Sequence, residues 1–94
     1  MSALAKTIRR LVEEERYVVS EHAAERLDER GIMEWQAVAG LADGVLIAEA
    51  FDAVPHPVIE VREELPDGTE IVAVWSYLPH SGVAKLVTAY FPNR

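Results

Sequence analysis

The sequence predicts one α+β domain over residues 1–94, with N-terminal helices packed on one face of a four-stranded antiparallel sheet. Apolar residues recur at helical spacing in the first part of the chain and alternate with other residues from Val45 onward. Short turn sequences separate the later segments, and connections of hairpin length require antiparallel pairing. Half of the 94 residues are hydrophobic, which predicts a globular fold with one core.

The first helix is expected over about residues 3–15, where Leu4, Ile8 and Leu11 share one face. The next run, Tyr17–Val19, consists of residue types that favour extended backbone. We interpret this run as a short extended link that leads from the first helix to the second.

The second helix is predicted to begin after Ser20, a favourable N-cap residue, and to run to about Arg30. Gly31 is expected to end it in the left-handed conformation that glycine adopts without steric cost. A third helix is predicted over about residues 34–43. Gly44 is expected to end this helix by the same conformation.

Four strands are predicted in the second half of the chain: Val45–Phe51, Val58–Leu65, Thr69–Leu78 and Val83–Phe91. The sequence Pro66-Asp67-Gly68 is a strong turn signal between the second and third of them. The last two strands are apolar on both faces, which is typical of central strands in a sheet.

One strand shows clearly which of its residues face the core. Ile59 and Val61 alternate with Glu60 and Arg62, so we expect the first pair to be buried and the second pair to face solvent. The full set of residues predicted to contribute to the core is Leu27, Ile32, Trp35, Val38, Ile47, Ile59, Val61, Val72, Val74 and Leu86.

Charge is distributed unevenly along the chain, whose net charge is −7. Residues 1–31 hold six basic and seven acidic residues, whereas residues 32–94 hold three basic and nine acidic residues. Proteins that bind nucleic acid through its phosphates present a basic surface, so this composition disfavours RNA as a partner. An acidic surface instead attracts basic partners.

The residue types that the sequence lacks restrict its expected cellular location and the metals or cofactors that it can bind. Without cysteine, disulfides and thiolate metal sites are excluded, and a reducing, cytoplasmic location is expected. No apolar run approaches the ~20 residues that span a membrane, and no signal-peptide pattern is found. His22, His56 and His80 lack the spacing of metal ligands, so we expect neither a metal nor a cofactor.

The predicted second helix carries the strongest candidate for a functional site. His22, Arg26 and Arg30 lie within about 80° of one another on a helix, next to the stripe of residues that faces the core. An imidazole could accept the proton of an RNA 2′-hydroxyl while an arginine stabilises the charged phosphorane. Alternatively, these residues form only solvated pairs with neighbouring glutamates.

The motif His22-Ala23-x-x-Arg26-x-x-x-Arg30-Gly31-Ile32 resembles the signature of the domain of unknown function 4258 family, which is similar to the BrnT and RelE type toxins. The resemblance extends over residues 17–92 and leaves residues 1–16 as an additional N-terminal helix. It implies a RelE/BrnT-like fold, a metal-independent endoribonuclease of a toxin–antitoxin type system, and an antitoxin-like partner. The chain departs from the family pattern at Met33, where a capping Ser or Thr is usual.

Two functions remain open at this point. In the first, His22 acts as the base, Arg26 and Arg30 bind phosphate, and Thr88 and Tyr90 on the last strand are possible helpers. In the second, the domain keeps the toxin-like fold but is not catalytic and binds protein. On either hypothesis we expect a homodimer or a protein partner, because helices on one face would leave apolar residues of the central strands uncovered on the other.

Overall fold

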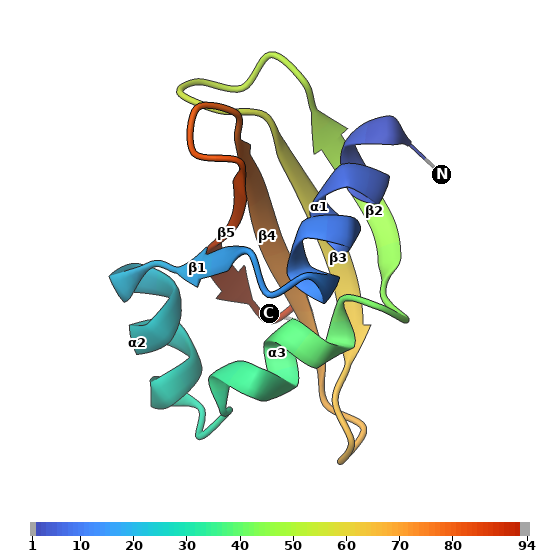
Figure 1. Ribbon diagram of the computed structural model, residues 1–94. Coiled ribbons are helices and arrows are strands. Elements are labelled where there is room, and N and C mark those ends of the chain that lie inside the picture. The colour runs from blue at the N-terminus through green and yellow to red at the C-terminus, as the bar shows by residue number, and fades with distance from the viewer. Residues whose placement is uncertain (1, 93–94) are drawn as a thin grey trace.

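The computed structural model describes residues 2–92 and has three helices beside a five-stranded sheet (Figure 1). The strand order across the sheet is β1-β5-β4-β3-β2. Within residues 2–92, none of the helices has the length and apolar character needed to cross a bilayer. The elements in chain order are α1 (Ala3–Glu13), β1 (Tyr17–Val19), α2 (Glu21–Glu29), α3 (Glu34–Gly40), β2 (Val45–Ala50), β3 (Val58–Glu64), β4 (Glu70–Leu78) and β5 (Val83–Tyr90).

The prediction of a purely antiparallel, four-stranded sheet is wrong in one respect. The predicted link is the strand β1, which pairs parallel with β5, with Tyr17 opposite Ala84 and Val19 opposite Leu86. The sheet therefore has five strands and is mixed. The other pairings, β2 with β3, β3 with β4 and β4 with β5, are antiparallel as predicted.

The ends of α2 follow from local chemistry, as predicted. The Ser20 hydroxyl accepts a hydrogen bond in the first turn of α2 and donates one to the Val87 carbonyl at 2.8 Å, which ties the helix start to β5. Gly31 has a φ of +69°, in the left-handed region. The Ile32 N–H then donates to the Leu27 carbonyl at 2.9 Å, so the chain folds back onto the helix.

Gly44 serves a different purpose from the one predicted. Its φ does not lie in the left-handed region, so it does not end α3 as Gly31 ends α2. A Cβ atom at Gly44 would lie 2.3 Å from Cγ1 of Val61, which is far inside van der Waals contact. Glycine is therefore required here because the backbone passes directly over β3. Arg9 also donates a hydrogen bond of 2.8 Å to the Gly44 carbonyl.

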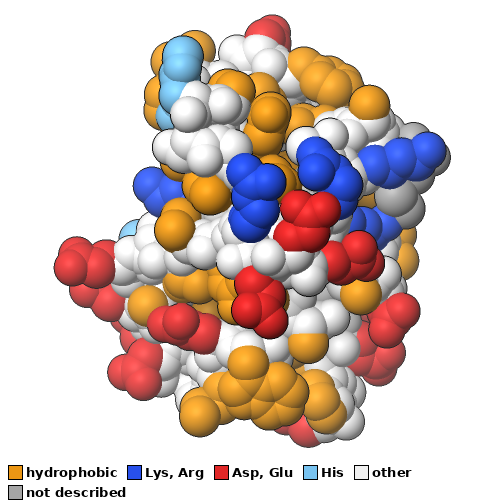
Figure 2. All heavy atoms as spheres, in the orientation of Figure 1, with side chains coloured by type: hydrophobic (Ala, Val, Ile, Leu, Met, Phe, Trp, Pro, Cys, Tyr) orange, Lys and Arg blue, Asp and Glu red, His pale blue; other side chains and the backbone are white. Residues whose placement is uncertain are grey.

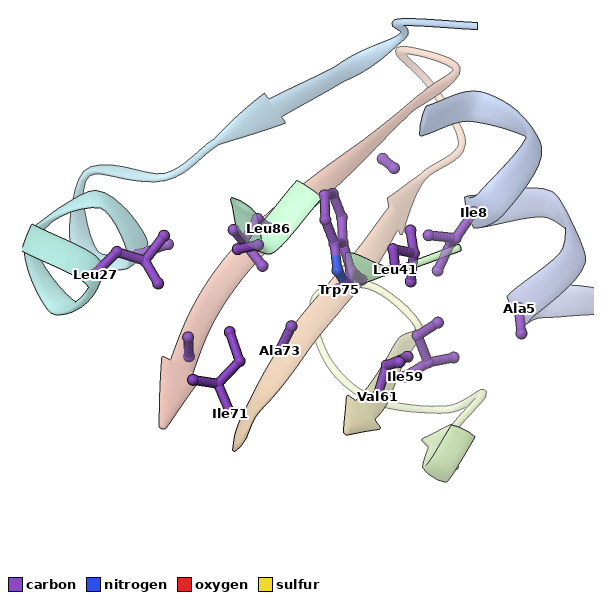
Figure 3. Packing of buried hydrophobic residues seen from close by; sticks show 14 of the residues in the cluster. Ala5, Ile8, Leu27, Leu41, Ile59, Val61, Ile71, Ala73, Trp75 and Leu86 are labelled. Atoms are coloured by element: carbon purple, nitrogen blue, oxygen red, sulfur yellow. The ribbon is translucent and has the colours of Figure 1, made fainter. Parts of the chain in front are cut away.

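The core lies between the three helices and one face of the sheet. Trp75 on β4 stands at its centre, next to Ile59 of β3 and Leu86 of β5 in the sheet register (Figure 3). Leu27 of α2 points toward Leu86, and α1 contributes Ile8 from the other side (Figure 3). Each helix thus places apolar side chains against the same sheet face.

Two residues predicted for the core are exposed, and each has a geometric reason. Trp35 is 61% exposed, because the side of α3 that faces the core is set by Ala37, about 200° further around the helix. Ile47 is 44% exposed, because its neighbour Leu46 packs on the core opposite Val61 and the next residue along a strand faces the other side.

The strand β4 is apolar on both faces, and its inward face is not the predicted one. Ala73 and Trp75 belong to the core, so Val72 and Val74 lie on the opposite face of the sheet. Val72 is nevertheless only 1% exposed, whereas Val74 is half-buried. The predicted inward orientation of Ile59 and Val61 is confirmed, since both are fully buried.

Leu27 is the apolar anchor of α2, and its truncation tests the packing of this helix. We expect Leu27→Ala to lower the free energy of unfolding by ~2–5 kcal/mol, because it removes buried methyl groups and leaves a cavity. The exposed Glu25→Ala on the same helix is the control and should change stability by less than ~0.5 kcal/mol. Chemical denaturation of the three proteins measures the difference, and equal stabilities would contradict the observed packing.

Candidate functional site

The three candidate residues lie at the surface of the protein, two of them on α2 and Arg30 at its C-cap. His22, Arg26 and Arg30 are all exposed. Arg26 Nη1 lies 3.9 Å from Oε1 of Glu29, one turn further along the helix. The guanidinium of Arg30 lies over the ring of Phe91, 4.2 Å from its centroid. Both arginines therefore have partners within the chain, whereas the His22 imidazole forms no hydrogen bond with any residue in 2–92.

The two possible helpers lie on the other face of the sheet. Tyr90 donates a hydrogen bond of 2.5 Å to Oε1 of Glu60, which points away from the core, and this bond raises the pKa of Tyr90. Thr88 lies opposite Val74, on the same outward face. Tyr90 lies next to Val72 in register, so its contact with Glu60 crosses over Val72 and explains why this valine is buried.

A β-bulge in β5 turns Thr88 and Tyr90 toward the sheet face that lies opposite α2. Leu86 and Thr88 differ by two positions and would face the same side of a regular strand. The β4–β5 register, however, pairs Trp75 with Leu86 and Val74 with Thr88, which leaves Val87 as an extra residue. Leu86 therefore faces the core beneath α2, whereas Thr88 and Tyr90 face outward. The structure therefore places Thr88 and Tyr90 on the face of the sheet opposite the helices, away from the candidate residues of α2.

The helix side of the protein carries both signs of charge. In Figure 2, basic side chains gather across the upper part of this face, where α1 lies in Figure 1, and acidic side chains lie mainly below and to the left of them. Arg10 and Arg16 each lie within 4 Å of Glu14. These exposed pairs contribute little stability and exchange readily with solvent ions.

Glu63 is the most perturbed titratable group in the described chain, and the sequence prediction missed it. Its side chain is 1% exposed and points from β3 into the interior, where neither carboxyl oxygen has a hydrogen-bond partner. Gly40 of α3 packs directly on it, since a Cβ there would lie 2.7 Å from Glu63 Oε1. The alternation of buried Ile59 and Val61 in the same strand continues to Glu63, and this signal could have identified it.

Burial raises the pKa of Glu63 from its ordinary value of 4.5 to about 8. The indole N–H of Trp75 lies close enough to offset part of this rise, although it does not form a hydrogen bond of good geometry with the carboxyl group. At neutral pH the side chain is therefore mostly protonated, which is the form that a low-dielectric environment favours.

Taken together, these features define an α+β domain with three helices on one face of a five-stranded mixed sheet. The chain belongs to the family described as Domain of unknown function (DUF4258), whose family model matches residues 19–91. The matched region includes α2, α3 and the strands β2 to β5, and α1 precedes it. No curated protein and no solved structure matches the chain.

The raised pKa of Glu63 predicts how stability depends on pH. Between 4.5 and about 8 the unfolded chain loses the Glu63 proton and the folded chain keeps it. The free energy of unfolding should therefore fall as pH rises through this window, by up to about 1.4 kcal/mol per pH unit from this group, and the loss should be complete above the folded pKa.

Glu63→Gln isolates the contribution of this one group. The amide has nearly the same shape but does not ionise, so the variant should gain stability relative to the parent protein as pH rises from 5 to 8. Urea denaturation at several pH values measures the difference between the two proteins. A constant difference across this range would show that Glu63 does not titrate as its burial implies.

Proposed function

We propose that this DUF4258 domain is a non-catalytic protein-interaction module. The observation that supports it best is the sheet face that the helices leave uncovered. Apolar side chains extend across this face from β1 to β2, and those at its two edges are exposed. The exposed ones are Val18, Val45 and Ile47, and the half-buried ones between them are Val58, Val74 and Val87. Several exposed apolar side chains on one face favour protein contact.

The charges on the uncovered face suit a second copy of the same chain. Glu60 and Arg62 point outward from β3, and Lys85 points outward from β5. Because both signs are present on one face, two copies related by a twofold axis can place opposite charges against each other. A face of a single sign would repel its own copy.

Self-association through this face is directly measurable. We expect sedimentation velocity at high micromolar concentration to detect a dimer, and we expect Ile47→Lys to shift the protein toward monomer by burying a charge in the interface. Ala3→Lys adds the same charge at an exposed position of α1 and should leave the dimer intact. A parent protein that is monomeric throughout would remove the support for a second copy.

A second candidate function is a RelE/BrnT-toxin-like, metal-independent endoribonuclease. It is favoured by the exposure of His22 and by Arg26, which follows one turn later on the same side of α2. The Arg26–Glu29 pair is exposed, so a phosphate could replace the glutamate at small cost. The outward position of Thr88 and Tyr90 counts against the full set of five residues acting on one phosphodiester.

An RNA-cleavage assay with purified protein separates the two candidates. For an interaction module we expect no cleavage above the buffer control, and no growth arrest when the protein is expressed in a bacterial host. Cleavage that is lost in both His22→Ala and Arg26→Ala, but kept in His80→Ala at an exposed turn, would replace the interaction module with the nuclease. Cleavage that persists in all three variants would also refute the interaction module and would place the nuclease site elsewhere.

A further inference from the structure

The two tryptophans of this chain differ sharply in their surroundings. Trp75 is fully buried at the centre of the core, whereas Trp35 on α3 is 61% exposed. Met33, two residues earlier, is also exposed. Tryptophan is the residue type most enriched among the anchors of protein interfaces. The large exposed indole therefore marks this end of α3 as a place where another molecule can bind.

A groove lies next to Trp35, between α3 and the end of β3. Its volume is about 220 Å³, which is below the size of most small-molecule sites and suits a single amino-acid side chain. In Figure 2, hydrophobic side chains gather at the lower edge of the helix side, in the area where α3 and the β3–β4 turn lie in Figure 1. The groove is lined by Trp35, Gln36, Ala39, Gly40, Asp43, Glu64 and Pro66.

The charges in the groove are acidic only. Asp43 and Glu64 stand on its two sides, and no Lys or Arg lines it. Neither carboxylate forms an ion pair or a side-chain hydrogen bond within the described residues. Two unpaired carboxylates beside an indole ring form a good environment for a planar cation, since the ring attracts it by a cation–π interaction and the carboxylates accept its N–H groups.

A buried carboxyl group lies behind the wall of the groove. Gly40 is part of the lining, and Oε1 of Glu63 packs against it from the interior side. Both oxygens of Glu63 lack a hydrogen-bond partner although the side chain is 1% exposed. A cation in the groove would therefore face two carboxylates at the surface and, beneath Gly40, a carboxyl group whose oxygens have no hydrogen-bond partner.

We propose that this groove binds an arginine side chain of a basic protein partner, with the guanidinium against Trp35 and between Asp43 and Glu64. This inference rests on the proposed function, because it names the chemistry of a partner for the interaction module. Arginine fits better than lysine, because its planar group stacks on an indole and presents several N–H donors to carboxylates. Nucleic acid does not fit, because its phosphates would meet carboxylates.

The exposed tryptophan itself provides the measurement. We expect a five-residue peptide made of glycine and two arginines to change the fluorescence of Trp35, with saturation at peptide concentrations below about 1 mM. The buried Trp75 should contribute a constant background. The same peptide with glutamines in place of the arginines should cause no change. Higher salt should weaken the binding, because exposed charges are screened.

Variants of the groove test its residues separately from the overall acidity of the protein. The double variant Asp43→Asn with Glu64→Gln should weaken peptide binding by about tenfold or more, because both acceptors for the guanidinium lose their charge. The double variant Glu21→Gln with Glu25→Gln removes the same charge from the exposed surface of α2 and should leave the affinity within about twofold. Trp35→Ala, followed by calorimetry, should also abolish binding.

Several results would overturn the inference. These are no saturable change with the arginine peptide, an equal response to the glutamine peptide, or an equal loss of binding in the two double variants. Failure of the groove is distinguishable from failure of the interaction module. If the peptide does not bind, but the protein dimerises and cleaves no RNA, only the proposal that the groove binds arginine is refuted. If the protein cleaves RNA in a His22-dependent manner, the interaction module falls whatever the peptide does.

Discussion

All three helices pack on the same face of the sheet, and this one-sided arrangement determines where each group discussed above lies. The inward face of the strands forms a single core around Trp75, to which α1, α2 and α3 all contribute. The outward face receives no helix and keeps its exposed valines and Ile47. Because side chains alternate along a strand, Glu63 is directed into the core by the same register that buries Ile59 and Val61.

The features that the sequence predicts correctly are those decided by a few neighbouring residues. Ser20 caps α2 and Gly31 ends it, because a hydroxyl oxygen and a left-handed glycine act within one turn of the chain. The turn at Gly68, with a φ of +88°, closes the hairpin that Pro66-Asp67-Gly68 predicts. The strand β1 was missed because three residues become a strand only by pairing with Ala84–Leu86, far along the chain.

The candidate site was predictable only as far as helical geometry extends. The spacing of His22, Arg26 and Arg30 predicts that they share one side of a helix; in the structure all three are exposed, and Arg30 is the C-cap residue that follows α2. Whether the last strand adds Thr88 and Tyr90 depends on the bulge at Val87, which reverses the face to which the following residues point. No residue type in this stretch identifies a bulge, so a regular strand was the natural expectation.

The orientation of an apolar residue is equally hard to predict when both faces of an element offer apolar surroundings. Val72 and Val74 have the same residue type as the buried valine of β3, but β4 directs Ala73 and Trp75 inward instead. Trp35 follows the same principle, since the short helix α3 uses Ala37 as its buried contact and leaves the larger side chain in solvent. Residue size alone does not decide burial where a glycine or alanine permits closer packing.

Two surfaces on the helix side of the protein, α2 and the junction of α3 and β3, differ in how far their residues are explained by stability alone. In α2 the sequence is explained by folding: the N-cap is satisfied, Leu27 is buried, and Arg26 pairs with an exposed glutamate. At the junction of α3 and β3 the chain buries an unpartnered carboxyl group at Glu63 and exposes an indole at Trp35. Natural proteins tolerate such departures mainly at functional sites. Since Trp35 lines the groove and Glu63 packs directly behind Gly40 of its wall, the junction of α3 and β3 is a better candidate than α2 for a binding surface on the helix side.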